Sequence, residues 1–240
     1  ADPHRRETLV KMDALLEGYP GSVKAVMNAR ELAGICGPVS RLLTVDGEYV
    51  TAIETALGAA VSNIIVEDEN SAKAAIRFLK DTHAGRATFL PLTSVNGKTL
   101  SEPTLSSARG YIGIASTLIS CDKKYDSVAA YLLGRTVVAD NLDNASLIAR
   151  KYGFRYKVVT LDGQVVNAGG SYTGGSAAFK TGVMSRSSDI ASLDKTIAET
   201  LAAAKKLNEK IAENEQAITE STEYIESLQN DLSNAQGGLY

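Results

Sequence analysis

The sequence has little of what catalytic and metal-binding sites are usually built from. Its 240 residues include no tryptophan, four phenylalanines, two cysteines and two histidines. Cys36 and Cys121 lie far apart and match no metal-binding or redox spacing, so we expect free thiols in a reducing, cytoplasmic compartment. No apolar run is long enough to cross a bilayer. These absences argue against a disulfide scaffold, a zinc domain and a membrane protein.

Sequence motifs for catalysis are also missing. Gly97-Lys98-Thr99 resembles the end of a phosphate-binding loop, but the motif requires glycine where Leu92 stands. The run Glu67-Asp68-Glu69 follows a strand-like segment and is interpreted as a solvated loop, and His83 as a turn residue. We therefore assign no catalytic residue, no metal site and no cofactor. A small α/β enzyme or ligand-binding module carried on a coiled coil remains the alternative interpretation.

The net charge of −3 is unevenly distributed along the chain. Residues 187–236 contain ten acidic and four basic side chains, a net charge of −6, which leaves the remainder with a net charge of +3. The acidity therefore belongs to the C-terminal segment. The excess of positive charge elsewhere is too small to indicate nucleic-acid binding by itself.

Both ends of the chain have helical periodicity. Residues 5–17 carry a short apolar stripe that includes Leu9, and Gly18-Tyr19-Pro20-Gly21 ends it. Residues 187–236 form a heptad repeat, in which Ser188 or Asp189 is the expected N-cap. The a positions of this repeat are mostly isoleucine or leucine: Ile190, Ile197, Ala204, Ile211, Ile218, Ile225 and Leu232. The two ends are expected to pair as an intramolecular antiparallel coiled coil, and a symmetric coiled-coil dimer is the alternative.

Between these ends the pattern predicts an α/β body built from two similar halves. Tyr49…Leu57-Gly58 recurs as Tyr125…Leu133-Gly134, and the order helix–strand–helix–strand occurs twice. The expected strands include residues 61–66 and 136–139. Asn70 is the expected N-cap of the helix after the first of them, and Asp143 or Asn144 that of the helix after the second. Any α/β protein alternates in this way, but the matched spacing favours a repeat.

A glycine-rich stretch, Gly169-Gly170-Ser171-Tyr172-Thr173-Gly174-Gly175, follows a predicted strand over residues 164–168. A glycine inside an element costs about 0.5–1 kcal/mol relative to alanine, so these four require compensation. Glycine is needed where the backbone adopts a conformation that Cβ forbids, or where a ligand or another backbone approaches very closely. We interpret the stretch as a place where a second protein chain comes close.

These features together resemble the hinge of a bacterial-type SMC (structural maintenance of chromosomes) protein. The resemblance covers about residues 18–183 and implies an α/β (α+β) fold of two pseudo-repeated subdomains, residues 18–105 and 106–183, between coil segments 5–17 and 187–236. The matching segments are Gly21-Ser22-Val23, Tyr49 to Gly58, Asn63 to Val66, Ala72 to Lys80, Gly85 to Leu92, Val158 to Gly163 and the glycine stretch. Ala59-Ala60 and Ala177-Ala178-Phe179 depart from what is common in the family.

The resemblance implies that this chain joins two copies of itself. In the family, hinges dimerise with the first subdomain of one chain against the second subdomain of the other, and the ATPase heads lie at the far ends of the coils. The fragment would thus lack ATPase activity. Five residues are expected at the contact: Gly169, Gly170, Tyr172, Gly174 and Gly175. Tyr172 is expected to be an aromatic anchor there or to pack within its own chain.

The resemblance also implies weak, sequence-independent DNA binding near the base of the coil, with a preference for single strands and a role in chromosome condensation and segregation at the nucleoid. Four cations match this expectation: Lys123, Lys124, Lys180 and Arg186. Arg155 and Lys157 are weaker candidates. The lysine pair is equally well interpreted as a solvated pair without a function. With few phosphate contacts, binding should fade at modest salt concentration.

Overall fold

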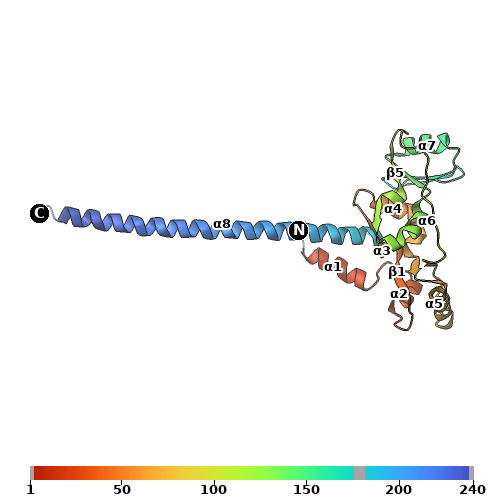
Figure 1. Ribbon diagram of the computed structural model, residues 1–240, viewed down its shortest axis with the longest axis horizontal. Coiled ribbons are helices and arrows are strands. Elements are labelled where there is room, and N and C mark those ends of the chain that lie inside the picture. Colours follow the sequence, from red (N-terminus) through yellow and green to blue (C-terminus); the bar gives the residue numbers. More distant parts are fainter. Residues whose placement is uncertain (1–2, 176–181, 238–240) are drawn as a thin grey trace. The chain divides into compact units, whose positions relative to one another are not determined.

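The structure is a computed structural model that describes residues 3–175 and 182–237. The contacts divide these residues into a body, residues 4–191, and a second unit that contains the helix from Ser192 onward. Figure 1 labels the elements. Within the described residues, no helix is long and apolar enough to cross a membrane.

The first half of the body packs helices around a three-stranded sheet in the order β1-β3-β4. β1 is antiparallel to β3, and β3 is parallel to β4, with α5 as the crossover between them. The first-half elements are α1 (Pro3–Ala14), α2 (Gly21–Asn28), β1 (Ile35–Pro38), α3 (Val39–Leu42), β2 (Leu43–Val45), α4 (Val50–Leu57), the 3-10 helix η1 (Gly58–Ser62), β3 (Ile64–Val66), α5 (Glu69–Asp81) and β4 (Phe89–Pro91).

The second half repeats this plan and extends it. Its sheet has five strands in the order β10-β9-β8-β7-β5, with α7 as the crossover between parallel strands β7 and β8. The second-half elements are β5 (Tyr111–Ile114), η2 (Ala115–Thr117), β6 (Ile119–Cys121), η3 (Lys123–Tyr125), α6 (Asp126–Leu133), β7 (Thr136–Ala139), α7 (Leu142–Lys151), β8 (Lys157–Thr160), β9 (Val165–Val166) and β10 (Tyr172–Thr173), and the chain then continues into α8 (Val183–Gly237).

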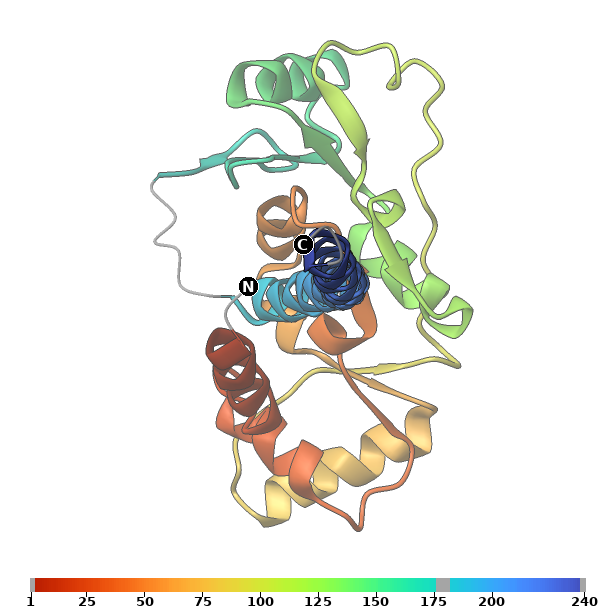
Figure 2. The same cartoon turned by 90° about the vertical axis from the view of Figure 1, so that its left-hand side faces the viewer.

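The strand registers confirm the predicted duplication. β1 pairs with β3 through a bulge between Ile35 and Gly37, and β5 pairs with β7 through a bulge between Tyr111 and Gly113. Each bulged position therefore recurs 76 residues later. In Figures 1 and 2 the crossover helices α5 and α7 lie at opposite ends of the body, so each half has its own helical face.

Strands β2 and β6, which the sequence did not predict, join the two halves. They occupy equivalent positions in the repeat and pair with each other antiparallel, with Thr44 opposite Ser120 at the centre. The pairing is therefore nearly symmetric within one chain. A large apolar core, containing Ile53, Val128 and Leu133, extends across this seam. Smaller cores lie under α5 and under α7.

Helix caps explain where α5 and α7 begin, and they correct the predictions. Asp68 caps α5 by accepting a hydrogen bond from the Ser71 backbone N–H at 2.8 Å. Asn141 caps α7 by accepting from the Asn144 backbone N–H at 2.9 Å. The predicted caps Asn70, Asp143 and Asn144 are wrong because each helix starts two or three residues earlier. The carboxylate of Asp68 and the side-chain amide oxygen of Asn141 each accept from a backbone N–H in the first turn of the helix, which would otherwise lack a partner.

Helix α8 is longer than the predicted coil. It begins at Val183, so Ser188 and Asp189 lie inside it and the prediction that one of them caps it is wrong. The turns of α8 that belong to the body are partly buried, and Met184 is fully enclosed in the central core. Asp189 forms an ion pair with Arg5 of α1 at 3.6 Å, in agreement with the predicted pairing of the two chain ends at the base of the coil.

In the second unit the heptad residues of α8 are exposed. Ile218, Ile225 and Leu232 are each more than half exposed. An apolar stripe of this length on a single helix is typical of one strand of a coiled coil.

Candidate functional site

The glycine stretch ends the second sheet at its open edge. Tyr172 and Thr173 form β10, which pairs on one side with β9 through Tyr172–Val166 and Thr173–Val165. The Tyr172 side chain is 53% exposed. Among the described residues β10 has no strand on its other side. An edge strand with free N–H and C=O groups is a template for pairing with another chain.

Contacts and backbone conformations within the chain explain why glycine occupies these positions. Gly169, Gly170 and Gly175 have φ of +89°, +93° and +138°, conformations that L-residues rarely adopt. Nothing lies within 4 Å of a Cβ built on Gly169 or Gly175. The backbone course around β10 thus accounts for these three glycines, and the prediction that a second chain lies close to them stays a prediction.

Gly174 is needed for a different reason, which is the side chain of Gln164. A Cβ on Gly174 would lie only 2.0 Å from Gln164 Oε1. This oxygen accepts a hydrogen bond from the Gly175 N–H at 2.9 Å, and Gln164 Nε2 donates to the Gly175 C=O at 3.2 Å. The amide of Gln164 therefore pairs with Gly175 as a backbone strand would, and it holds the end of β10 in place. Sequence reasoning missed Gln164 because no motif marks it.

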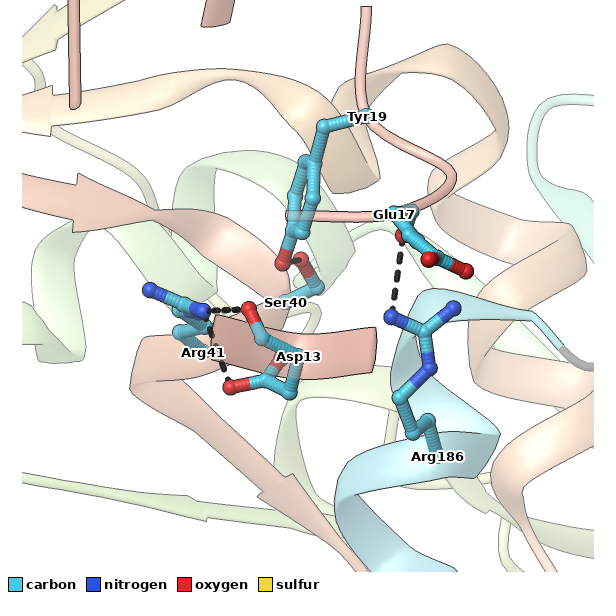
Figure 3. Close-up of polar contacts among 6 residues, drawn as sticks. All are labelled: Asp13, Glu17, Tyr19, Ser40, Arg41 and Arg186. Carbon is cyan, nitrogen blue, oxygen red and sulfur yellow. Dashed lines mark hydrogen bonds and ion pairs between the residues drawn. The ribbon is translucent and has the colours of Figure 1, made fainter. Parts of the chain in front are cut away.

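The base of the coil contains a buried arginine. Arg186, in the first turn of α8, is 2% exposed, and its Nη1 donates to the Glu17 backbone C=O at 2.9 Å. Its Nε is buried without a hydrogen-bond partner among the described residues. Figure 3 shows the guanidinium directed at the backbone that leaves α1. Arg186 cannot contact a DNA phosphate in this position, so we correct that prediction and assign it to the junction between the coil and the body.

Two further contacts complete this junction (Figure 3). The hydroxyls of Tyr19 and Ser40 form a buried hydrogen bond of 2.7 Å, and burial raises the pKa of Tyr19. Arg41 of α3 binds the Asp13 carboxylate at 2.9 Å, and it also donates to the Asp13 backbone C=O. The last turn of α1 and the segment that follows it are therefore both held to α3.

Glu54 of α4 caps the start of α8. Burial raises the pKa of its carboxyl group, while hydrogen bonds from the backbone N–H groups of Met184 and Val183 lower it. A Cβ on Gly182 would overlap the Glu54 carboxylate. An acidic side chain at a helix N-terminus satisfies free N–H groups and the helix dipole. Helix α8 is thus bound to the first half through Glu54 and to the end of α1 through Arg186.

Of the remaining predicted DNA-binding residues, the structure describes two adjacent lysines. Lys123 and Lys124 are exposed on η3, just before α6. A hydrogen bond to Tyr125 raises the pKa of Lys124, and its Nζ lies 4.9 Å from the centre of that ring. Lys124 is therefore charged at neutral pH, and both lysines are accessible. Lys180 lies outside the described residues.

The two weaker DNA candidates have other partners. Lys157 is half buried, and its Nζ donates to the Ala56 C=O at 2.8 Å, at the C-terminal end of α4. Burial lowers its pKa. Arg155 stacks near Tyr156 and donates from Nε to the Tyr152 C=O. Lys157 is therefore corrected from a DNA contact to a link between the two halves.

The acidic run Glu67-Asp68-Glu69, considered above as a possible metal site, has structural contacts instead. Asp68 is a helix cap, and Thr93 donates to the carboxylate of Glu69 at 2.9 Å. The described residues include no group of three or more His, Cys, Asp and Glu side chains that could hold a metal ion. Cys36 and Cys121 are free and partly buried, and burial raises the pKa of both thiols.

Comparisons with known proteins agree with this arrangement. Residues 32–149 match the family model of the SMC proteins Flexible Hinge Domain. The chain is 42% identical over 193 residues to the chromosome partition protein Smc of Halothermothrix orenii, which covers 79% of this chain and 16% of that protein. It is 40% identical over 200 residues to the Bacillus subtilis protein of the same name, covering 81% and 17%. The chain thus spans less than a fifth of these relatives.

Two solved structures are similar to most of this chain. One is an asymmetric dimer of the Geobacillus stearothermophilus SMC hinge domain, with a TM-score of 0.81 and 38% identity over 88% of this chain and 86% of that one. The other is the Pyrococcus furiosus SMC protein hinge domain, with a TM-score of 0.56 and 31% identity over 71% and 88% of the two chains.

Proposed function

This chain belongs to the SMC hinge domain family, and we propose that it joins two copies of itself through the open edge of β10. The observation that carries the proposal is this edge strand, which among residues 3–175 and 182–237 is paired on one side only and carries an exposed tyrosine. The similar Geobacillus hinge was solved as a dimer. Pairing of a partner strand with β10 would satisfy the free backbone groups of both chains.

We further infer that the hinge links the two long coiled-coil arms of a chromosome-partitioning SMC protein in the cytoplasm, at the nucleoid. The exposed heptad of α8 supports an arm that continues from this body. In this proposal residues 5–17 and 187–236 are coil, and residues 18–105 and 106–183 are the two hinge subdomains. The hinge takes no part in catalysis, and any ATPase activity belongs to heads elsewhere in the parent protein.

Weak, sequence-independent binding to DNA, with single strands preferred, is the second part of the proposal. Lys123 and Lys124 support it, because both are exposed on η3 and a raised pKa keeps Lys124 charged. Two adjacent lysines supply few phosphate contacts, so the affinity should fall with a log–log salt slope of about −0.7 per contact on single strands.

Sedimentation at several protein concentrations tests the dimer. The native chain should sediment as a dimer at micromolar concentration, and Tyr172→Pro should sediment as a monomer. The Tyr172 N–H is directed away from β9 and makes no bond within its own sheet, so proline there removes a donor and the exposed ring at the open edge but no hydrogen bond to β9. Unchanged far-UV circular dichroism verifies the fold of the variant. A native chain that remains monomeric at every concentration would contradict the proposal.

A further inference from the structure

The turn that joins α1 to the body differs from what the sequence predicts. The apolar stripe of the N-terminal coil, Leu9, Met12 and Leu16, predicts a helix that continues to Glu17. Helix α1 instead ends at Ala14. Leu16 leaves the stripe and is 3% exposed in the core under α5. Its side chain thus has two apolar environments available, the coil stripe and the core of the first half.

Leu16 has a backbone conformation that is unusual for leucine. Its φ is +53°, in the left-handed region. The Leu16 N–H donates to the Asp13 C=O at 3.0 Å. The Glu17 N–H donates to the Met12 C=O at 2.9 Å. These two bonds form a Schellman motif, in which the left-handed residue after the helix is usually glycine, so leucine is costly there and its burial offsets the cost.

A glycine two residues later offers a second place for the helix to end. Gly18 has a φ of +86°, so this next left-handed position is already formed. If Leu16 adopted a helical φ, α1 would continue to Glu17 and Gly18 would become the left-handed residue of a new Schellman motif. Leu16 is the only residue from Met12 to Glu17 with a left-handed backbone. The conformation of this one residue therefore decides between the two helix ends.

Contacts on either side of the turn show what would move (Figure 3). The Glu17 C=O accepts from the buried Arg186 at 2.9 Å, which fixes the end of the turn to α8. Helix α8 is itself anchored by Met184 in the central core. On the other side of the turn, Arg41 of α3 binds Asp13. The turn therefore lies between a fixed end at Glu17 and the Asp13–Arg41 contact, which must break if α1 lengthens.

Helix α5 ends with the same backbone pattern but lacks this alternative. His83 has a φ of +53° and Gly85 a φ of +91°. The Ala84 N–H donates to the Leu79 C=O at 3.1 Å, as in a Schellman motif. His83 is polar and exposed, so a longer α5 would bury no further apolar side chain there. The choice between two apolar environments belongs to Leu16 of the coil.

We propose that residues 15–17 form a two-state switch at the root of the N-terminal coil. In the observed form α1 ends at Ala14 and Leu16 lies in the core under α5. In the second form α1 continues to Glu17 and Leu16 lies on the coil stripe, so that the helix gains about 4.5 Å and most of a turn. Because α8 stays anchored, the change alters the register of α1 against α8. All of these residues belong to one copy, so the switch does not depend on the proposed homodimer.

Spin-label distances within one copy test the switch. Labels at Lys11→Cys of α1 and Lys73→Cys of α5, both exposed positions, report where α1 lies on the body in a background with Cys36→Ser and Cys121→Ser. The labelled chain is diluted with unlabelled chain, so that distances between copies do not contribute. The native turn should give one main distance, and the second form a separate distance that differs by several ångströms.

Leu16→Gly and Leu16→Ala form the matched pair. Both variants remove the leucine side chain from the core, but they favour opposite forms of the turn. Glycine adopts the left-handed conformation readily and is a poor helix former, whereas alanine has the reverse preferences. Each preference amounts to about fivefold, so the ratio of the second form to the observed form should be about twenty-five times higher with alanine than with glycine.

Arg41→Ala leaves the turn itself intact and removes only the contact with Asp13. It should raise the population of the second distance about fivefold. Arg30→Ala removes the same charge from an exposed position of the first half and should leave the distances unchanged. If the two Leu16 variants give the same distances, or Arg41→Ala behaves as Arg30→Ala, the switch is overturned. Sedimentation of the same samples reports the dimer separately, so loss of the switch leaves the proposed function standing.

Discussion

The two halves of this hinge follow one plan but differ at their edges. Both contain a bulged antiparallel strand, a crossover helix and a capped helix start, yet only the second half continues into β9 and β10. The first half is left with β4 as an open edge. The two halves of the duplicated unit have therefore become unlike at the edges of their sheets. The predictions below test how far the equivalence of the halves extends.

The largest effect is expected at Gly97, which lies between the two halves and is packed against the second half. The segment between the halves passes against α6, so that a Cβ on Gly97 would lie 1.9 Å from the Tyr131 backbone nitrogen. Gly97→Ala must separate two backbones and should lower the free energy of unfolding by about 3 kcal/mol, measured by urea denaturation. In the first half, Gly47 has nothing within 4 Å, and Gly47→Ala should change stability by less than about 0.5 kcal/mol. Equal losses would contradict this difference.

The N-caps of the two crossover helices should contribute equally to stability, because they occupy equivalent positions in the two halves. Asp68 and Asn141 make the same hydrogen bond to the third following N–H. Asp68→Ala and Asn141→Ala should each cost about 1 kcal/mol of stability in the same urea assay. Asn70→Ala and Asp143→Ala are the controls, because these two side chains are not the caps. A loss at one cap only would show that the halves do not depend equally on their crossover helices.

Helices and strands that are marked by a pattern of neighbouring residues could be predicted from the sequence. The repeated Tyr-to-Leu-Gly spacing correctly predicted α4 and α6, and the β-branched runs predicted β3 and β7. Helix starts were misplaced by two or three residues, because several neighbouring Asp and Asn residues are all good caps and only the backbone course selects one. Strands β2 and β6 were missed, since three residues give too little alternation and their stability comes from pairing across the seam.

At the candidate site, too, features with a local sequence pattern were predicted and features that depend on distant contacts were missed. The glycine stretch was recognised from its cost, but Gln164, which holds Gly175 through its amide, carries no sequence signal. Arg186 was assigned to DNA because it is a cation beside a coil. Its burial depends on the Glu17 carbonyl, which lies far away in the sequence. Contacts between residues distant along the chain are what a single sequence leaves undetermined.

Glu54 marks another difference between the halves, because its equivalent in the second half is Ala130. Glu54→Ala should leave the first N–H groups of α8 without an acceptor and cost about 1 kcal/mol at pH 7. Glu54→Gln keeps an oxygen acceptor and should cost less. Burial raises the pKa of Glu54 in the folded state, so the folded chain binds this proton more tightly than the unfolded chain. The stability that Glu54 contributes therefore falls as the pH rises from the ordinary glutamate pKa of 4.5 through the raised pKa.

The matching measurement compares urea midpoints of the native chain and Glu54→Gln between pH 4 and pH 7. The advantage of the native chain over the glutamine variant should be greatest at the acid end and should shrink toward neutral pH. A constant difference between the two proteins would show that Glu54 does not titrate in this range, and the burial argument would be wrong.

The smallest effect is expected at the lysine pair, where the halves differ in charge. Lys123 and Lys124 precede Tyr125, whereas Gly47 and Glu48 occupy the equivalent positions before Tyr49. If DNA binds on this side, the second half alone should carry it. Lys123→Glu with Lys124→Glu should abolish a gel shift with single-stranded DNA at low salt, since two phosphate contacts are lost and repulsion replaces them. Lys205→Glu with Lys206→Glu on α8 makes the same charge change and should leave the shift intact. Equal losses in both variants would mean that net charge, and not this pair, accounts for the binding.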